Sequence, residues 1–147
     1  MNLFGAMDIS ASGLTAQRLR LDIIANNLAN AETTRTEAGG PYRRQVPVFE
    51  VRQPEDSFAA VFGRAAAGGF TGGGVRVARI DQDASPFKMK YDPGHPDADA
   101  QGYVQLPNVN VVTEMVDLIS ATRAYEANIT AINSAKAMIA RALEIGR

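Results

Sequence analysis

The sequence predicts a mainly α-helical fold in which two long terminal helices enclose a small β-rich insert. Three observations support this prediction. Residues 115–143 carry apolar side chains at alternating three- and four-residue steps, without Gly or Pro, and residues 3–31 repeat an apolar side chain every seven positions. The chain between them is rich in Gly and Pro and contains short alternating segments. Because both helices have one apolar seam, we expect them to pair as an antiparallel coiled coil from which the insert projects.

The C-terminal helix is predicted from the spacing of its apolar positions. An average step of about 3.5 residues is typical of a narrow stripe that packs against another helix. Two polar residues, Thr122 and Lys136, interrupt this stripe. Asn108 or Asn110 is suited to begin the helix, and Glu114 lies where the helix dipole favours an acid. The predicted pairing residues are Met115, Leu118, Tyr125, Ile129, Ile132, Ile139 and Leu143.

The N-terminal helix is predicted from an interval of seven residues. Its expected pairing residues are Met7, Leu14, Leu21 and Leu28. Three Asn residues follow near residue 30, where amide side chains favour helix ends and turns. Apolar residues beside both stripes, among them Val116, Ile119 and Met138, would remain uncovered in a two-helix hairpin. Such exposed apolar surface indicates association with other chains.

The insert is predicted to contain loops and short strands. Residues 32–45 lack periodicity, and the following strand, residues 46–52, contains Pro47 and therefore suits a sheet edge. Residues 53–74 are rich in Gly, with a flexible stretch expected at 63–74. We expect a β-hairpin between residues 75–81 and 87–91, followed by a short strand at 103–106. The predicted organisation is thus a terminal-helix assembly domain, residues 1–33 plus 108–147, and an insert, residues 34–107.

The composition excludes several classes of protein. The 15 basic and 16 acidic residues give a net charge of −1, which argues against a nucleic-acid binder and a polybasic membrane-surface protein. The chain has no Cys and no apolar run long enough for a transmembrane segment. Its first residues lack the pattern of a cleavable signal peptide. We therefore expect either a cytoplasmic protein or one exported without such a peptide.

No motif in the sequence predicts catalysis. His95 is the only histidine and lies in a Pro- and Gly-rich turn, which is too little for a zinc site or a catalytic triad. The glycines at 68–74 lack the Lys-Ser/Thr ending of a phosphate-binding loop. The basic pair Arg43-Arg44 is interpreted as solvated or as an interface salt-bridge donor. We expect no enzyme activity, no cofactor and no metal.

Three segments resemble a known family. ANNLANAETT (residues 25–34) resembles the motif of the bacterial flagellar axial proteins, which include rod, hook and hook-associated subunits. PYRRQVPVFE (residues 41–50) and the segment from Tyr103 to Arg147 narrow the resemblance to the proximal rod subunits of the basal body. The residues that carry the first motif are Ala25, Asn26, Asn27, Leu28, Ala29 and Asn30.

The resemblance implies a non-enzymatic structural subunit of the tubular rod, which transmits torque from the membrane ring to the hook. Its expected partners are the other rod subunits, the rod-base adaptor and the membrane ring. Its expected location is the periplasm-spanning rod, reached through the flagellar type III export apparatus. The alternatives are another rod- or hook-type axial subunit, a cytoplasmic coiled-coil export adaptor, and a small enzyme whose site the sequence does not reveal.

Overall fold

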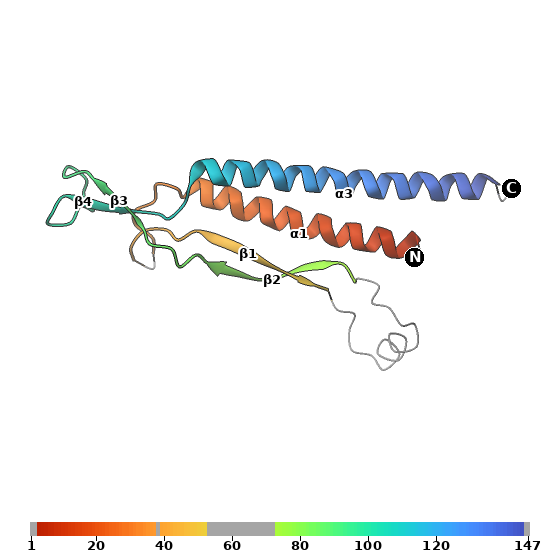
Figure 1. Ribbon diagram of the computed structural model, residues 1–147, viewed down its shortest axis with the longest axis horizontal. Helices are drawn as coiled ribbons and strands as arrows, with labels where there is room; N and C mark the ends of the chain where they lie inside the picture. The colour runs from red at the N-terminus through yellow and green to blue at the C-terminus, as the bar shows by residue number, and fades with distance from the viewer. Residues whose placement is uncertain (1–2, 38, 53–72, 146–147) are drawn as a thin grey trace, which may run out of the picture. The chain divides into compact units, whose positions relative to one another are not determined.

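The computed structural model describes residues 3–37, 39–52 and 73–145 (Figure 1). The predicted mainly α-helical fold with a small β part is confirmed. Most of the predicted Gly-rich segment, 53–72, lies outside the described residues. The elements, in chain order, are α1 (Leu3–Ala29), β1 (Gln45–Val51), β2 (Val75–Gln82), β3 (Lys88–Tyr91), β4 (Tyr103–Leu106) and α3 (Val111–Ile145).

The ends of the helices are set by Asn side chains. Helix α3 begins at Val111, directly after Asn110, which caps it: the Asn110 Oδ1 accepts a hydrogen bond from the Val112 backbone N–H at 3.1 Å. At the end of α1, the Asn30 side chain donates to the Asn26 carbonyl at 2.9 Å. The capping role expected of Asn108 or Asn110 therefore belongs to Asn110.

The strands pair differently from the prediction. The expected hairpin between residues 75–81 and 87–91 is wrong, because β2 pairs with β1, and β3 pairs with β4. The β3–β4 pair is antiparallel, with a register from Lys88 opposite Leu106 to Tyr91 opposite Tyr103. The Asn108 amide, which lies shortly before α3, donates to the carbonyls of Asp83 (3.0 Å) and Ser85 (3.2 Å). The residues between β2 and β3 are thus bonded to the segment that leads into α3, and β3 does not turn back on β2. Alternation identified the strands but not their partners.

The chain divides into two compact units, and each contains a segment of both helices. We call them unit 1 and unit 2 and describe each by itself. Their limits are Met1–Leu19, Phe49–Ala78 and Thr122–Arg147 for unit 1, and Arg20–Val48 and Arg79–Ala121 for unit 2.

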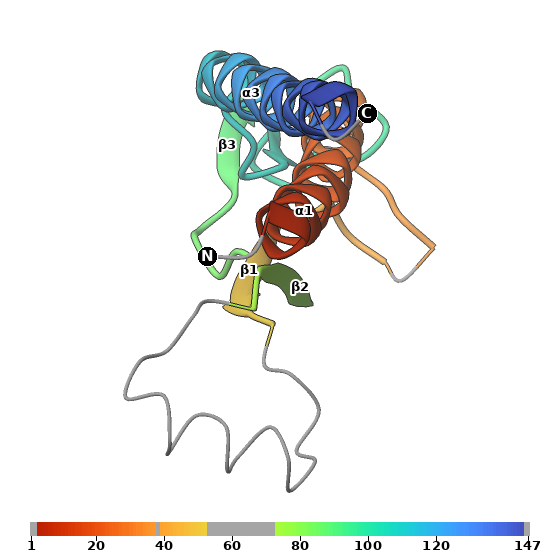
Figure 2. The ribbon, with the colours of Figure 1, turned by 90° about the vertical axis from the view of Figure 1, so that its right-hand side faces the viewer.

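In unit 2 the two helix segments run antiparallel. Arg20 of α1 lies opposite Asp117 of α3, with 3.0 Å between guanidinium and carboxylate, and Asn27 lies opposite Glu114 at 3.2 Å. As the residue number rises along α1 it falls along α3, and both views show the segments side by side (Figure 1, Figure 2). The buried apolar side chains of this unit are Ile23, Ile24, Val104, Val109 and Ala121.

In unit 1 the helix segments approach through small residues. A Cβ atom added at Gly13 would lie 3.0 Å from the Asn128 side chain, and Ala16 and Ala135 are buried. Strand β2 begins against α1, where the Ser12 hydroxyl accepts a hydrogen bond from the Val75 backbone N–H at 3.0 Å. The preceding Gly74 has a φ of +92°, a conformation that side-chain-bearing residues rarely adopt.

Candidate functional site: the helix contact and its polar cluster

The face that α3 buries agrees with the predicted stripe at every second position. At most of the positions between, the more buried residue is the one that precedes the predicted residue. The series Leu118, Tyr125, Ile132 and Ile139 is half-buried. The most deeply buried positions, however, are Glu114, Ala121 and Ala135. They are also separated by multiples of seven residues. Met115, Ile129 and Leu143 are exposed by 51%, 37% and 70%. Thr122 and Lys136 are exposed as well, so the two polar interruptions of the predicted stripe lie outside the buried face.

In helix α1, too, the most deeply buried residues differ from the predicted pairing residues. The predicted residues Met7, Leu14, Leu21 and Leu28 are all half-buried, whereas Ala16, Ile23, Ile24 and Asn27 are fully buried. Within the ANNLAN motif the structure separates the members by exposure. Ala25, Asn26 and Ala29 are exposed, Leu28 and Asn30 are half-buried, and Asn27 is only 1% exposed. Asn27 is thus the motif residue that faces the interior of unit 2.

The Asn27 side chain is saturated with hydrogen bonds. Its Nδ2 donates to the Gln45 carbonyl at 2.8 Å and to Glu114 Oε2 at 3.2 Å. Its Oδ1 accepts from the Gln45 backbone N–H and from the Tyr42 hydroxyl, both at 2.9 Å. An amide offers two donors and two acceptor lone pairs, and all four are used here. Asn27 therefore joins α1 to the beginning of β1 and to α3.

Glu114 is the most deeply buried charged residue of the described chain, with 0% exposure. Its Oε1 accepts from Arg44 Nε at 2.6 Å, while its Oε2 accepts from Asn27. A buried carboxylate is tolerated only when it is paired and hydrogen-bonded, and both conditions hold. The first turn of α3 is in this way bonded to α1 and to the segment that precedes β1.

Arg44 is the centre of charge in this cluster. Beyond Glu114, its two terminal nitrogens lie 3.7 Å from an Asp83 oxygen and 3.6 Å from an Asp117 oxygen. Its backbone N–H donates to Asn108 Oδ1 at 2.8 Å. Burial opposes its charge, but the hydrogen bond to Glu114 and the three carboxylates together raise the pKa of Arg44. Arg44 directly precedes β1, and Asp83 directly follows β2. Arg44 therefore connects the beginning of β1 and the end of β2 to α3.

Two further groups titrate away from their ordinary range. Burial, with the charge of Glu114 as a smaller cause, raises the pKa of the Tyr42 hydroxyl. Hydrogen bonds from the Ser85 side chain and backbone, together with Arg44, lower the pKa of Asp83. We call Asn27, Tyr42, Arg44 and Glu114 the polar cluster.

Sequence reasoning missed the polar cluster. From the sequence, Asn27 is assigned to a helix end and Glu114 to the helix dipole, and neither role requires burial. The Arg43-Arg44 pair was interpreted as solvated or as an interface donor, yet Arg44 pairs within its own chain. Glu114 shares a seven-residue series with Ala121 and Ala135, but only the structure shows that this series is buried. A charged residue in such a series indicates a buried partner on the facing segments.

On the side of α3 opposite the polar cluster, unit 2 exposes an apolar strip. Val112, Met115, Val116 and Ile119 are exposed by 70%, 51%, 62% and 54%. Their spacing of three, four and seven residues places them on one helix face. We call these four residues the α3 strip. Contiguous apolar surface of this kind marks an interaction site.

The described residues offer little for other chemistry. In residues 3–37, 39–52 and 73–145, no three His, Cys, Asp or Glu side chains gather as a metal site requires. None of the helices in these ranges has the apolar window needed to cross a membrane. The arrangement suits packing against other proteins.

Comparison with known proteins leads to the same family as the residue patterns. Residues 7–35 match the family model described as flagella basal body rod protein, and residues 100–145 match the flagellar basal body rod FlgEFG protein C-terminal model. These matches cover most of α1 and all of α3. Both lie where the family resemblance was expected.

Full-length relatives carry one name. The chain is 54% identical to the flagellar basal-body rod protein FlgC of Borreliella burgdorferi, over 99% of this chain and 98% of the relative. It is 47% identical to the Bacillus subtilis protein of the same name and 43% identical to that of Salmonella typhimurium, with full coverage of both chains in each case. The chain therefore belongs to the FlgC family of flagellar basal-body rod proteins.

Proposed function

We propose that this protein is a structural subunit of the flagellar rod and that the α3 strip is one of its assembly surfaces. The observation that carries the proposal is the contrast between the two sides of α3 in unit 2. One side is occupied by the polar cluster, in which Glu114 has both carboxylate oxygens bonded. The other side leaves four apolar residues exposed. A neighbouring subunit that covers this strip would bury apolar surface at roughly 25 cal/mol per Å².

The finer parts of the proposal concern the rod itself. The terminal helices pair as an antiparallel coiled coil through the half-buried members of the predicted seam, among them Leu14, Leu21 and Leu118. The subunit belongs to the proximal rod. Its neighbours are other rod subunits, the rod-base adaptor and the membrane ring, and the rod transmits torque to the hook. The chain reaches the periplasm through the flagellar type III export apparatus. Family membership and the exposed apolar residues support this assignment.

The test of the α3 strip is a charge placed within it. Val116→Asp should leave the free energy of unfolding of the isolated chain within about 0.5 kcal/mol of wild type, because the side chain is already exposed. In the rod the same carboxylate would be buried without a partner, so basal bodies should lack this subunit and cells should not swim. The matched control is Ser120→Asp, an exposed position of the same helix outside the strip.

Two outcomes would contradict the proposal. Normal motility of cells that carry only Val116→Asp would remove the α3 strip from the assembly surface. Recovery of the wild-type chain only from the soluble cytoplasm, and never with purified basal bodies, would instead favour the export adaptor over the rod subunit. Swimming assays and fractionation of tagged cells separate these two results.

A further inference from the structure

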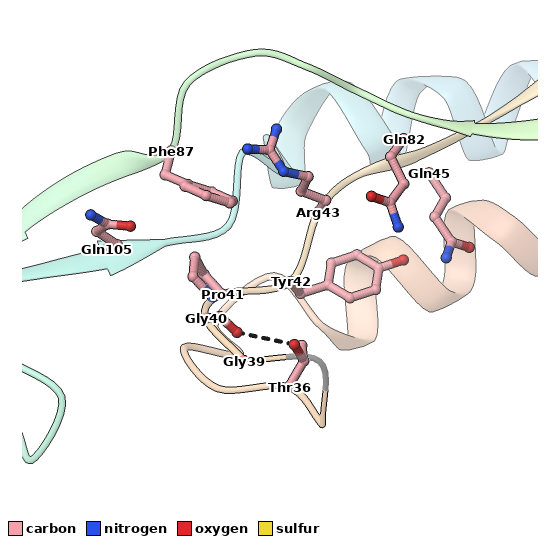
Figure 3. A pocket seen from close by; sticks show the side chains of 10 residues that line it. All are labelled: Thr36, Gly39, Gly40, Pro41, Tyr42, Arg43, Gln45, Gln82, Phe87 and Gln105. Carbon is pink, nitrogen blue, oxygen red and sulfur yellow. Dashed lines mark hydrogen bonds between the residues drawn. The ribbon is translucent and has the colours of Figure 1, made fainter.

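Unit 2 contains an open cavity that shares Tyr42 with the polar cluster and has no lining residue in common with the α3 strip. Its volume is about 510 Å³, and it is lined by Thr36 and residues 39–43 on one side and by residues at the ends of β1, β2 and β4 and just before β3 on the other (Figure 3). The side chains that matter for its chemistry are Pro41, Arg43, Gln45, Gln82, Phe87 and Gln105. A second hollow of about 330 Å³ shares Gly40, Pro41 and Gln105 with it and is also lined by Asp97 and Asp99. We call the two neighbouring hollows together the groove.

Three glutamines give this groove a capacity for hydrogen bonds that its own unit does not use. Among the described residues, the side-chain amides of Gln45, Gln82 and Gln105 have no hydrogen-bond partner. Each amide presents a donor and an acceptor together, which is the pattern that a peptide group of an extended backbone requires. Three such amides along one groove suit a polypeptide in extended conformation.

Arg43 supplies a fixed positive charge to the same groove. Its guanidinium lies 4.4 Å from the centre of the Phe87 ring and donates through one terminal nitrogen to the Asp83 carbonyl at 3.1 Å. No carboxylate within the described residues forms an ion pair with it, in contrast to the neighbouring Arg44. The remaining donors of Arg43 are oriented by the stacked ring, and an incoming carboxylate is their natural partner.

The aromatic residues argue against a carbohydrate ligand. Sugar rings pack on open aromatic faces, but the Arg43 guanidinium lies over the ring of Phe87. The Tyr42 hydroxyl is already committed to Asn27 at 2.9 Å. The far end of the groove carries two carboxylates, Asp97 and Asp99, against the single guanidinium of Arg35. The groove therefore has a positive and a negative end, which complements a peptide with an acidic and a basic side chain.

We propose that this groove binds an extended segment of a neighbouring protein, with a carboxylate of that segment on Arg43 and its backbone on the three glutamine amides. A basic side chain of the same segment lies near Asp97 and Asp99. The identification of the neighbour as a flagellar protein rests on the proposed rod function. The groove is a contact separate from the α3 strip, because it recognises backbone and charge and not an apolar helix face.

The experiment is site-specific photocrosslinking in purified basal bodies. The photoreactive residue p-benzoylphenylalanine replaces Gln82 in one variant and Gln105 in another, and a third variant carries it at Lys90, which is exposed but lines neither hollow. Both groove positions should crosslink to one contiguous partner segment that contains Asp or Glu, identified by mass spectrometry. Lys90 should not crosslink to that segment.

Charge variants test the role of Arg43. Arg43→Glu should lower the crosslink yield about tenfold, the usual effect of losing one charge-assisted hydrogen bond, whereas Arg43→Lys should retain most of it. Exchanging the mapped acidic residue of the partner for Lys should restore the yield in the Arg43→Glu background. If Arg43→Glu lowers the unfolding midpoint, Gln82→Ala, scored through the Gln105 crosslink, takes its place with an expected loss of about threefold.

Each result has a defined meaning. A crosslink to a glycan, to a helical segment, or to no molecule at all overturns the groove proposal, as does an unchanged yield in Arg43→Glu. Absence of the chain from basal bodies would instead overturn the proposed rod function. The two failures are thus distinguishable, because the first requires that the chain is present in the particles.

Discussion

The two units hold the same pair of helices by different means. In unit 2 the contact contains directional bonds, since Asn27 and Glu114 are almost fully buried and use their polar atoms on α1, α3 and the approach to β1. In unit 1 the two helix segments approach closely where Gly13 faces Asn128, and the buried positions among its described residues are the small Ala16 and Ala135. Directional bonds fix which residues face each other, whereas small residues allow the backbones to approach closely. The contact in unit 2 therefore fixes the register of its own helix segments, and the contact in unit 1 brings its own segments close together.

The largest effect should come from removing the buried acid of unit 2. Glu114→Ala leaves Arg44 Nε and one Asn27 donor without their acceptor, and breaking a buried ion pair from one side costs about 3 kcal/mol. Urea unfolding followed by circular dichroism would measure this loss. The matched control is Glu126→Ala, an exposed acid of the same helix, which should change the free energy of unfolding by less than about 0.5 kcal/mol.

The isosteric variant Glu114→Gln separates charge from shape. Its amide would direct an NH₂ group at either Arg44 Nε or Asn27 Nδ2, both of which are donors. We expect a cost of about 1–3 kcal/mol, the penalty for an unsatisfied buried polar group. Equal unfolding midpoints for the wild type and both Glu114 variants would show that the polar cluster does not fix the register.

The second effect concerns the close approach in unit 1. Gly13→Leu adds a side chain where even a Cβ would lie 3.0 Å from Asn128 Nδ2, and overpacking of this kind costs about 2 kcal/mol. The control is Gly5→Leu in the same helix, because a Cβ at Gly5 meets nothing within 4 Å. That variant should gain roughly 0.5–1 kcal/mol from the better helix propensity of Leu. Two changes of the same sign would contradict the close-packed contact of unit 1.

A third, smaller effect is expected where β2 begins against α1. Gly74→Ala places a methyl group against the Ser12 hydroxyl at a φ of +92°, and the expected cost is about 1.5 kcal/mol. Gly94→Ala is the control, since its Cβ would meet only Asp92 Oδ1 at 3.8 Å. Thermal unfolding of both variants tests the difference. If Gly74→Ala melts with the wild type, the Ser12–Val75 hydrogen bond does not hold the strand.

The sequence allowed the elements to be predicted more reliably than their contacts. Apolar spacing located both helices and four strands, because amphipathic periodicity depends on local geometry. It could not tell which side of α3 is buried, since the helix has apolar residues all around and the closest contacts use Ala121 and Ala135, which carry little hydropathy signal. Nor could it pair the strands, because β2 was assigned to the segment nearest in the chain. The polar cluster joins residues far apart in sequence, a relation that no local pattern contains.

The smallest effect, and the most specific to unit 2, concerns the Tyr42 hydroxyl. Tyr42→Phe removes the hydrogen bond to Asn27 Oδ1, which still accepts from the Gln45 N–H, so the cost near neutral pH should be about 1 kcal/mol. Burial and, to a smaller extent, the charge of Glu114 raise the pKa of Tyr42 above its ordinary value of 10.0. The unfolded chain therefore ionises first, and the stability contributed by the protonated hydroxyl is complete below that pH. It is lost as pH rises from there through the folded-state pKa.

The difference in free energy of unfolding between wild type and Tyr42→Phe should accordingly shrink above about pH 10. Urea unfolding at a series of pH values, with absorbance near 295 nm to follow tyrosine ionisation, would measure it. Tyr125→Phe is the control, because that half-buried tyrosine belongs to the α3 segment of unit 1. A difference that stays constant or grows with pH would mean that the hydroxyl is not enclosed by the polar cluster. Unit 2 would then share the less directional contact of unit 1.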